Sequence, residues 1–160
     1  MLDAIPAIKG PGGQLRKRPG KLHADEAYDF ACCRKFYSEH FLPHQPPDAQ
    51  IIPVSRTVGN DRVVDELIYT FTHTIEMDWM LPGIPPTGRR VEVPMAVVVH
   101  FRDGKIAHEH IYWDQASVLV QIGLIDPERL PVSGAESVRK VLDPPSVPSN
   151  ELIERAERRK

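Results

Sequence analysis

Two histidines and an aspartate lie close together in the second half of the chain, at His108, His110 and Asp114. The run 105–114 is rich in β-forming residues and follows a D-G turn, which predicts a strand. Successive side chains of a strand point to opposite faces, so these three residues share one face with Tyr112. We predict that this face is the polar wall of a pocket for a small molecule.

The other face of the same run carries Ile111 and Trp113, which indicates that neither face is fully open to solvent. A carboxylate in a dry cavity has a raised pKa and acts as a base toward an acidic C–H or O–H, and imidazole exchanges protons near neutral pH. Enolisation, dehydration or ring closure then needs no cofactor and no metal. We predict Asp114 as the acid/base residue, with His110 and His108 as donor or tuning groups.

A second set of pocket candidates precedes this strand. His73 and Tyr69 share one face of the strand predicted at 62–74, and His73 fits either a pocket or a core position bonded to the backbone. Trp79 and Met80 open an apolar loop that runs into a rigid G-I-P-P-T-G segment, and such a loop suits a lid over a hydrophobic ligand. The predicted pocket therefore includes Tyr112, His73, Tyr69, Trp79 and Met80.

Periodicity and turn signals predict the elements that position these residues. Apolar side chains recur at helical spacing from Asp25 to about Leu42, where prolines end the helix. Pro53 indicates an edge strand, and the two-sided apolar pattern of 90–101 indicates a central strand with a bulge at Pro94. The predicted fold class is α+β, with strands at 50–58, 62–74, 90–101 and 105–114 and short helices at 115–122, 134–142 and 150–158.

The composition favours one globular domain: 160 residues, 41% hydrophobic and 26% charged. We divide the chain into a basic arm at 1–22, an α+β domain at 23–125 and a proline-rich extension with short helices at 126–160.

A net charge of −2, and an arm without aromatic residues, argue against a nucleic-acid partner. The sequence has neither an apolar run of about 18 residues nor a signal-peptide pattern, so we expect a cytoplasmic protein with no membrane partner. Cys32 and Cys33 are expected to be free thiols.

Four short motifs occur in order between about residues 50 and 125. They are G-I-P-P-T-G-R at 83–89, F-R-D-G-K-I at 101–106, a strand that ends in Asp114, and Q-I-G at 121–123. In this order they resemble the SnoaL-like polyketide cyclase family, which has a G-x-P-P-T-G-[KR] turn, an F-x-D-G-K-I hairpin, a strand ending in Asp and a Q-L-G helix end.

The resemblance implies the cone of the nuclear transport factor 2-like superfamily, in which a curved mixed or antiparallel sheet wraps around helices and a deep cavity. It implies that Asp114 stands where family cyclases keep an acid/base aspartate, that His110 replaces a common tryptophan, and that His108 replaces a common glutamate. It further implies a homodimer and a cyclase, isomerase or lyase (dehydratase) acting on a hydrophobic, cyclic or polyketide-like molecule. Family members begin with a closing helix, which here is expected to be missing or irregular because only the basic arm precedes Asp25.

Two other classes of function fit the same residues. His108-x-His110 followed by Asp114 imitates the metal-binding H-x-H plus carboxylate pattern of cupins, although no histidine follows Asp114 to complete a second cupin motif. Stoichiometric metal in the purified protein would establish that alternative. The other class is a non-catalytic ligand-binding or accessory domain, in which substitution of Asp114 and His110 leaves turnover unchanged.

Overall fold

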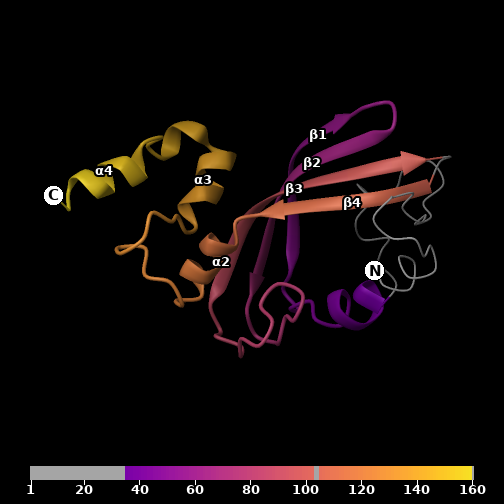
Figure 1. Cartoon of the computed structure of the whole chain (residues 1–160), viewed down its shortest axis with the longest axis horizontal. Helices are drawn as coiled ribbons and strands as arrows, with labels where there is room; N and C mark the ends of the chain where they lie inside the picture. Colours follow the sequence, from indigo (N-terminus) through magenta and orange to yellow (C-terminus); the bar gives the residue numbers. More distant parts are fainter. Residues whose placement is uncertain (1–34, 103–104, 160) are drawn as a thin grey trace, which may run out of the picture.

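The computed structural model describes residues 35–102 and 105–159; the predicted basic arm, Cys32, Cys33 and most of the helix predicted at 25–42 lie outside them. A four-stranded antiparallel sheet in the order β1-β2-β3-β4 forms the centre of the described chain (Figure 1). The predicted α+β class is confirmed. The elements are η3 (Phe36–Phe41, a π-helical segment), β1 (Gln50–Val58), β2 (Arg62–Thr72), β3 (Arg90–Arg102), β4 (Lys105–Trp113), α2 (Gln115–Gln121), α3 (Glu136–Leu142), η4 (Pro144–Ser146, a 3₁₀ turn) and α4 (Glu151–Glu157).

The positions of two prolines in the sheet follow from their missing N–H donor. The β1–β2 register shifts between Pro53 and Ser55, on an edge strand as predicted. The bulge predicted at Pro94 is wrong, because Pro94 pairs regularly with Ile68 of β2. The β3–β4 ladder ends at Met95, so the nitrogen of Pro94 faces an edge that no described strand covers.

A bulge does occur in β4. His108 pairs with His100 of β3, but Ile106 pairs with Phe101, which leaves Ala107 as an extra residue. Strict alternation would put Ile106 on the same face as His108. The bulge instead turns Ile106 into the core, where it is 7% exposed.

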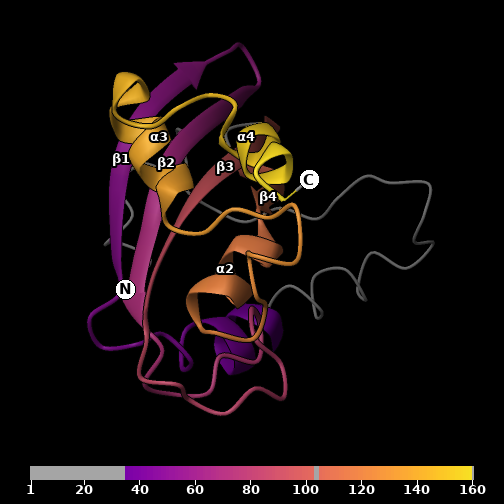
Figure 2. The same ribbon diagram turned by 90° about the vertical axis from the view of Figure 1, so that its left-hand side faces the viewer.

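The hydrophobic core lies on one face of the sheet, which we call the inner face. The sheet curves, and η3 and α2 lie on the same side of it (Figure 2). Side chains from the 77–81 segment and α2 pack against alternate residues of β2 and β3. The buried cluster comprises Leu67, Tyr69, Phe71, Met77, Met80, Leu81, Val91, Val93, Met95, Val97, Val99, Ile106, Val118 and Ile122.

The C-terminal extension packs against the rest of the domain. Helix α3 packs on β3, its Val138 is only 3% exposed, and the Ser117 hydroxyl of α2 donates to the Gly134 carbonyl at 3.0 Å. The helices predicted at 134–142 and 150–158 occur as α3 and α4. Among the described helices, none has the length and apolar character needed to cross a membrane.

Asp114 begins helix α2 by capping it. Its carboxylate accepts from the backbone N–H groups of Ala116 and Ser117. We expect Asp114→Ala to lower the free energy of unfolding by about 1 kcal/mol, because two N–H groups lose their acceptor. Asp114→Asn keeps a side-chain oxygen there and should stay close to wild type. Urea denaturation of both variants tests this, and equal stability of Asp114→Ala and wild type would contradict the capping role.

Candidate functional site

The predicted polar row lies on the outer face of the sheet, opposite the core. In the β3–β4 ladder His110 is opposite Val98, whereas the core residues of β3 are the neighbouring Val97 and Val99. Side chains alternate between faces, so His110 points away from the core. Tyr112 shares this face and is 60% exposed. His108, His110 and Tyr112 share one face as predicted, whereas Asp114 follows the end of β4. The expectation that this face is enclosed is wrong for His110 and Tyr112.

The histidine rings of this outer row lie against one another. The rings of His108 and His100 stack at a centroid distance of 4.7 Å, and those of His108 and His110 lie at 4.9 Å. Across residues 35–102 and 105–159, no three or more His, Cys, Asp or Glu side chains are grouped so that they could hold a metal ion. The described residues therefore offer the H-x-H pair no third ligand of these types.

Asp114 lies at the end of β4 and is exposed. One of its oxygens, Oδ1, accepts from Ala116 N at 2.9 Å and from Ser117 N at 3.2 Å. This helix-capping contact accounts for an aspartate at this position on structural grounds alone. The acid/base role of Asp114, with His110 and His108, stays a prediction.

Three of the predicted pocket residues lie in the core. Met80 is 2% exposed, and Tyr69 is 6% exposed and donates its hydroxyl to Gln45 Oε1 at 2.5 Å. His73 is fully buried, and its Nδ1 accepts from the Thr87 backbone N–H at 3.3 Å. This contact assigns the neutral ring a proton on Nε2. His73 therefore ties the end of β2 to the G-I-P-P-T-G segment, and burial lowers its pKa.

The inner face of β4 carries a carboxyl group that the sequence-based prediction passed over, Glu109. The Tyr37 hydroxyl of η3 donates to Glu109 Oε2 at 2.5 Å. Burial raises the pKa of Glu109, and the hydrogen bond from Tyr37 opposes that rise. One signal could have found it: Glu109 is the only charged residue among Ala107, Glu109, Ile111 and Trp113, which alternation puts on one face. A carboxylate on an apolar face needs a partner or a function.

An aromatic cluster connects η3 to the far end of β4. Trp79 lies at a centroid distance of 5.0 Å from Phe41, 6.0 Å from Tyr69 and 6.3 Å from Trp113. Phe41 in turn meets Tyr37, the partner of Glu109, at 5.6 Å. Trp79 therefore packs on the inner side of the sheet, and its role in a ligand pocket stays a prediction.

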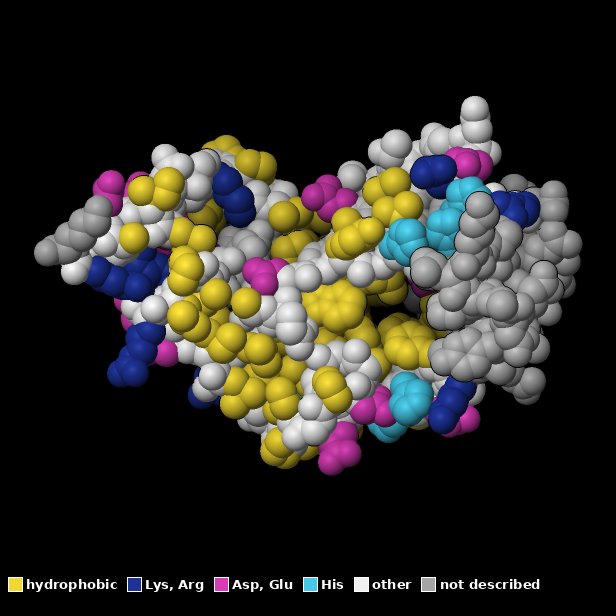
Figure 3. Space-filling model, viewed as in Figure 1, with side chains coloured by type: hydrophobic (Ala, Val, Ile, Leu, Met, Phe, Trp, Pro, Cys, Tyr) yellow, Lys and Arg dark blue, Asp and Glu magenta, His cyan; other side chains and the backbone are white. Residues whose placement is uncertain are grey.

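Two sets of contacts connect β4 to η3: the Tyr37–Glu109 hydrogen bond, and the ring contacts of Trp79 with Phe41 and Trp113. A hollow lies between them. Ile111 lies between Glu109 and Trp113 on the inner face, opposite buried Val97, yet it is 36% exposed. Its exposure indicates that the space in front of it is not filled. Figure 3 shows a dark hollow with hydrophobic side chains around it, between β4 and η3. We call the space between η3 and the inner face of β4 the β4–η3 hollow. Glu109, Ile111 and Trp113 lie on that face of β4, Tyr37 and Phe41 belong to η3, and Trp79 contacts Phe41 and Trp113.

A surface cluster holds η3 against the loop that carries Trp79. Asp78 Oδ2 lies 2.5 Å from His40 Nδ1, and Asp78 Oδ1 lies 3.0 Å from His44 Nδ1. The bond with His40 lowers the pKa of Asp78, and both histidines add to this effect by their charge. The cluster fixes Trp79, the next residue, in its place beside η3.

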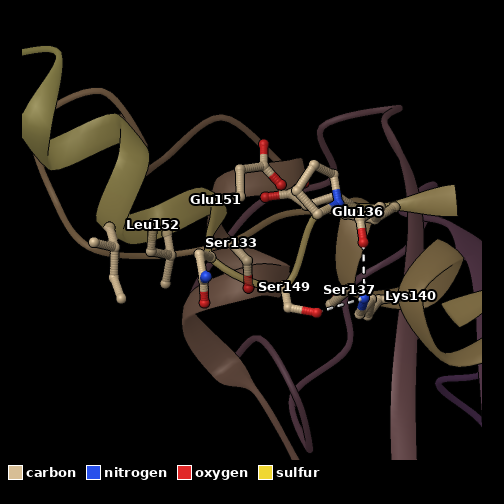
Figure 4. Close-up of a pocket in the computed structure, with 11 residues that line it drawn as sticks. Ser133, Glu136, Ser137, Lys140, Ser149, Glu151 and Leu152 are labelled. Atoms are coloured by element: carbon tan, nitrogen blue, oxygen red, sulfur yellow. Dashed lines mark hydrogen bonds between the residues drawn. The ribbon is translucent and has the colours of Figure 1, made fainter. Parts of the chain in front are cut away.

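Two further pockets lie among the C-terminal helices. One of about 320 Å³ is lined by α3, the segment after η4 and the start of α4 (Figure 4). Its Lys140 ammonium donates to the Pro144 and Val147 carbonyls at 2.7 Å and to the Ser149 hydroxyl at 3.0 Å. All three donors of Lys140 are used, so it holds this segment in place. The second pocket, of about 400 Å³, is lined mainly by arginine and glutamate side chains.

The described sheet and helices form an α+β domain. The model of the SnoaL-like polyketide cyclase family matches residues 44–122, so the predicted resemblance to this family is confirmed over that segment. No curated protein matches the sequence significantly.

Several solved structures are similar to the chain. AclR from Streptomyces galilaeus is 22% identical, with 69% of this chain and 77% of AclR covered and a TM-score of 0.48. TsrD from Streptomyces laurentii is 18% identical, with 78% and 84% covered and a TM-score of 0.49. IdmH from Streptomyces antibioticus is 24% identical, with 76% and 86% covered and a TM-score of 0.45.

The raised pKa of Glu109 makes the stability of the protein depend on pH. The folded state holds the Glu109 proton more tightly than the unfolded state, so this stabilisation is full below the ordinary pKa of 4.5 and is lost as pH rises through the folded-state value. Glu109→Gln cannot ionise and still offers Tyr37 an acceptor. We expect it to melt at a higher temperature than wild type at about pH 7, with the difference vanishing near pH 4. A difference that does not change with pH would contradict this.

His73 makes the stability of the protein depend on pH in the opposite direction and in a higher pH range. Burial lowers its pKa below the ordinary 6.5, so its contribution is present above 6.5 and is lost as pH falls through the folded-state value. In His73→Asn, Oδ1 takes the place of Nδ1 as acceptor from Thr87 but does not titrate. We expect the decline in stability between about pH 6.5 and 5 to be shallower in His73→Asn than in wild type, as measured by urea denaturation. Parallel curves would assign the decline to other groups.

Proposed function

We propose that this protein binds a hydrophobic, cyclic small molecule in the β4–η3 hollow and that Glu109 moves a proton on it. The observation that carries the proposal is a partly buried carboxyl group with a raised pKa, held by Tyr37 beside an aromatic wall. A carboxylate of raised pKa is a stronger base toward a weakly acidic C–H than an ordinary one. The family of the matched segment supports a cyclase- or isomerase-type reaction.

The proposed step uses one proton and one electron pair. The ionised Glu109 carboxylate takes a proton from a carbon next to a carbonyl group, and the C–H electron pair moves to the carbonyl oxygen, giving an enolate. The neutral Glu109 then returns a proton, either to another carbon (isomerisation) or to the oxygen of a leaving group (dehydration). Alternatively the enolate carbon attacks a second carbonyl and closes a ring, and the alkoxide that forms on the second carbonyl oxygen takes the proton from neutral Glu109. Tyr37 acts as a positioning residue, since its hydroxyl fixes the carboxyl group.

Asp114 as acid/base residue, with His110 and His108, is the alternative arrangement. It places the reaction at the outer face of β4 and the start of α2. The two arrangements use carboxyl groups on opposite sides of the strand, so single substitutions separate them. Asp114→Asn is well suited for this, because the cap of α2 is expected to survive.

A ketone probe tests the proton transfer without knowledge of the natural substrate. In D₂O, the α-protons of α-tetralone exchange for deuterium once a base removes them, and ¹H NMR measures the rate. We expect wild-type protein to accelerate the exchange and Glu109→Gln to lose about a hundredfold or more of that acceleration. Asp114→Asn should keep it. The wild-type rate should rise with pH as Glu109 ionises, with a midpoint above 4.5.

Other results of the exchange experiment would contradict the proposed role of Glu109. Loss of exchange in Asp114→Asn, with Glu109→Gln unaffected, would overturn the role of Glu109 in favour of Asp114. Binding of tetralone without accelerated exchange in any variant would contradict catalysis and establish a ligand-binding domain. Acceleration that disappears with a chelator and returns with a metal ion would replace side-chain catalysis by a metal site.

A further inference from the structure

The second C-terminal pocket, of about 400 Å³, is bordered by α2, the loop that follows α2, α3 and α4. Four arginines line it: Arg139 from α3, and Arg155, Arg158 and Arg159 from the end of α4. Figure 3 shows dark-blue Lys and Arg side chains gathered near the C-terminal end of the chain. We call this space the arginine pocket; none of its lining residues belongs to the β4–η3 hollow.

Two of the four guanidinium groups converge on one oxygen atom. Arg155 Nη1 donates to the Pro127 carbonyl at 2.8 Å, and Arg159 Nη2 donates to the same carbonyl at 3.2 Å. Like charges held this close repel each other, and the ion pair between Arg159 and Glu128 is long, at 3.7 Å, and exposed. The helix dipole favours cations at the end of α4, but it does not bring two of them to one acceptor. An anion in the pocket would offset this repulsion.

The other two guanidinium groups keep their donors available. Neither the Arg139 nor the Arg158 side chain forms a hydrogen bond or an ion pair with another described residue. A guanidinium presents its N–H donors in a planar fork, which matches pairs of oxygen atoms on a phosphate or a carboxylate. Because Arg139 and Arg158 belong to different helices, their donors reach the pocket from two elements. Both features are typical of a site for an oxyanion.

Three carboxyl groups in the same wall restrict the rest of the ligand. Glu128 contacts Arg159, and Glu136 Oε1 accepts from the Gly134 N–H at 2.7 Å. The Glu151 side chain has no hydrogen bond or ion pair to another described residue. An ionised carboxylate can only accept hydrogen bonds, so Glu151 repels a bare anion but binds a hydroxyl group. A ligand that carries both an oxyanion and hydroxyl groups suits this mixed wall.

We propose that the arginine pocket binds a small molecule that carries a phosphate group and hydroxyl groups, as a sugar phosphate does. Arg139 and Arg158 donate to the phosphate oxygens, the Arg155 and Arg159 charges add to the attraction, and Glu151 accepts from a hydroxyl group. The volume of about 400 Å³ falls in the range of small-molecule sites, about 300–1,000 Å³. This site is separate from the hollow and does not depend on Glu109.

Calorimetric titration with glucose 6-phosphate, inorganic phosphate and glucose tests this inference. We expect the wild-type protein to bind glucose 6-phosphate more tightly than phosphate, and glucose at least tenfold more weakly than glucose 6-phosphate. Arg139→Gln and Arg158→Gln should each lower the affinity for glucose 6-phosphate about tenfold, because each removes a charge-assisted hydrogen bond. Arg129→Gln is the matched control: Arg129 is 85% exposed, lies outside the pocket and pairs with Asp126, so its loss should leave the affinity unchanged.

A fourth variant tests the carboxylate. Glu151→Gln removes a negative charge from the wall, so it should bind inorganic phosphate more tightly than the wild type does. It also weakens the acceptor for a hydroxyl group, so its preference for glucose 6-phosphate over phosphate should shrink. An unchanged preference would contradict the contact between Glu151 and a hydroxyl group.

Several results would overturn the proposal. These are no binding of glucose 6-phosphate to the wild-type protein, binding of glucose as tight as that of its phosphate, or the same loss of affinity in Arg129→Gln as in the pocket variants. Displacement of glucose 6-phosphate by α-tetralone would place both molecules in one site and contradict a separate pocket. If a pocket variant does not fold, ³¹P NMR of the wild-type protein decides: an unshifted glucose 6-phosphate signal would overturn the site.

Discussion

The inner face of β4 packs toward the hydrophobic core, and this constraint decides which side chains of the strand can meet a ligand away from water. Val97 and Val99 of β3 set that face through their cross-strand partners Ile111 and Glu109. Because side chains alternate, the neighbouring His110 points outward. The inner carboxyl group lies among aromatic rings with a raised pKa, whereas the outer imidazole is exposed. One register thus separates two sets of titratable groups that are adjacent in the chain.

The end of β4 shows how one residue can satisfy a sequence motif for a structural reason. The first N–H groups of a helix have no partner within it, and the Asp114 carboxylate accepts two of them. The same helix ends with Gln121, whose side-chain amide bonds to both the N–H and the C=O of Glu92 on the edge of β3 that β4 does not reach. Helix α2 therefore extends the sheet and closes one end of the core. An aspartate and a glutamine at these positions support the fold whatever the reaction is.

Three buried or partly buried polar groups differ in how the protein compensates for their loss of hydration. His73 stays neutral and bonds through Nδ1 to the backbone of the G-I-P-P-T-G segment. Glu109 accepts from Tyr37, and burial favours its protonated form. Among the described residues, neither the Trp79 N–H nor the His73 Nε2 has a hydrogen-bond partner.

Local sequence patterns determined the elements of this protein. Alternation, turn signals and proline positions predicted all four strands and the helices after β4 to within about two residues, because these signals depend on neighbours in the chain. The ordered motifs also predicted the family whose model matches residues 44–122. The tertiary structure alone decided which face of β4 is enclosed, since both faces mix apolar and titratable residues. That choice depends on packing against Val97 and Val99, and on Tyr37 and Trp79, which are distant in sequence. Alternation along a strand defines two faces, but only contacts between distant segments select the one that lines a site.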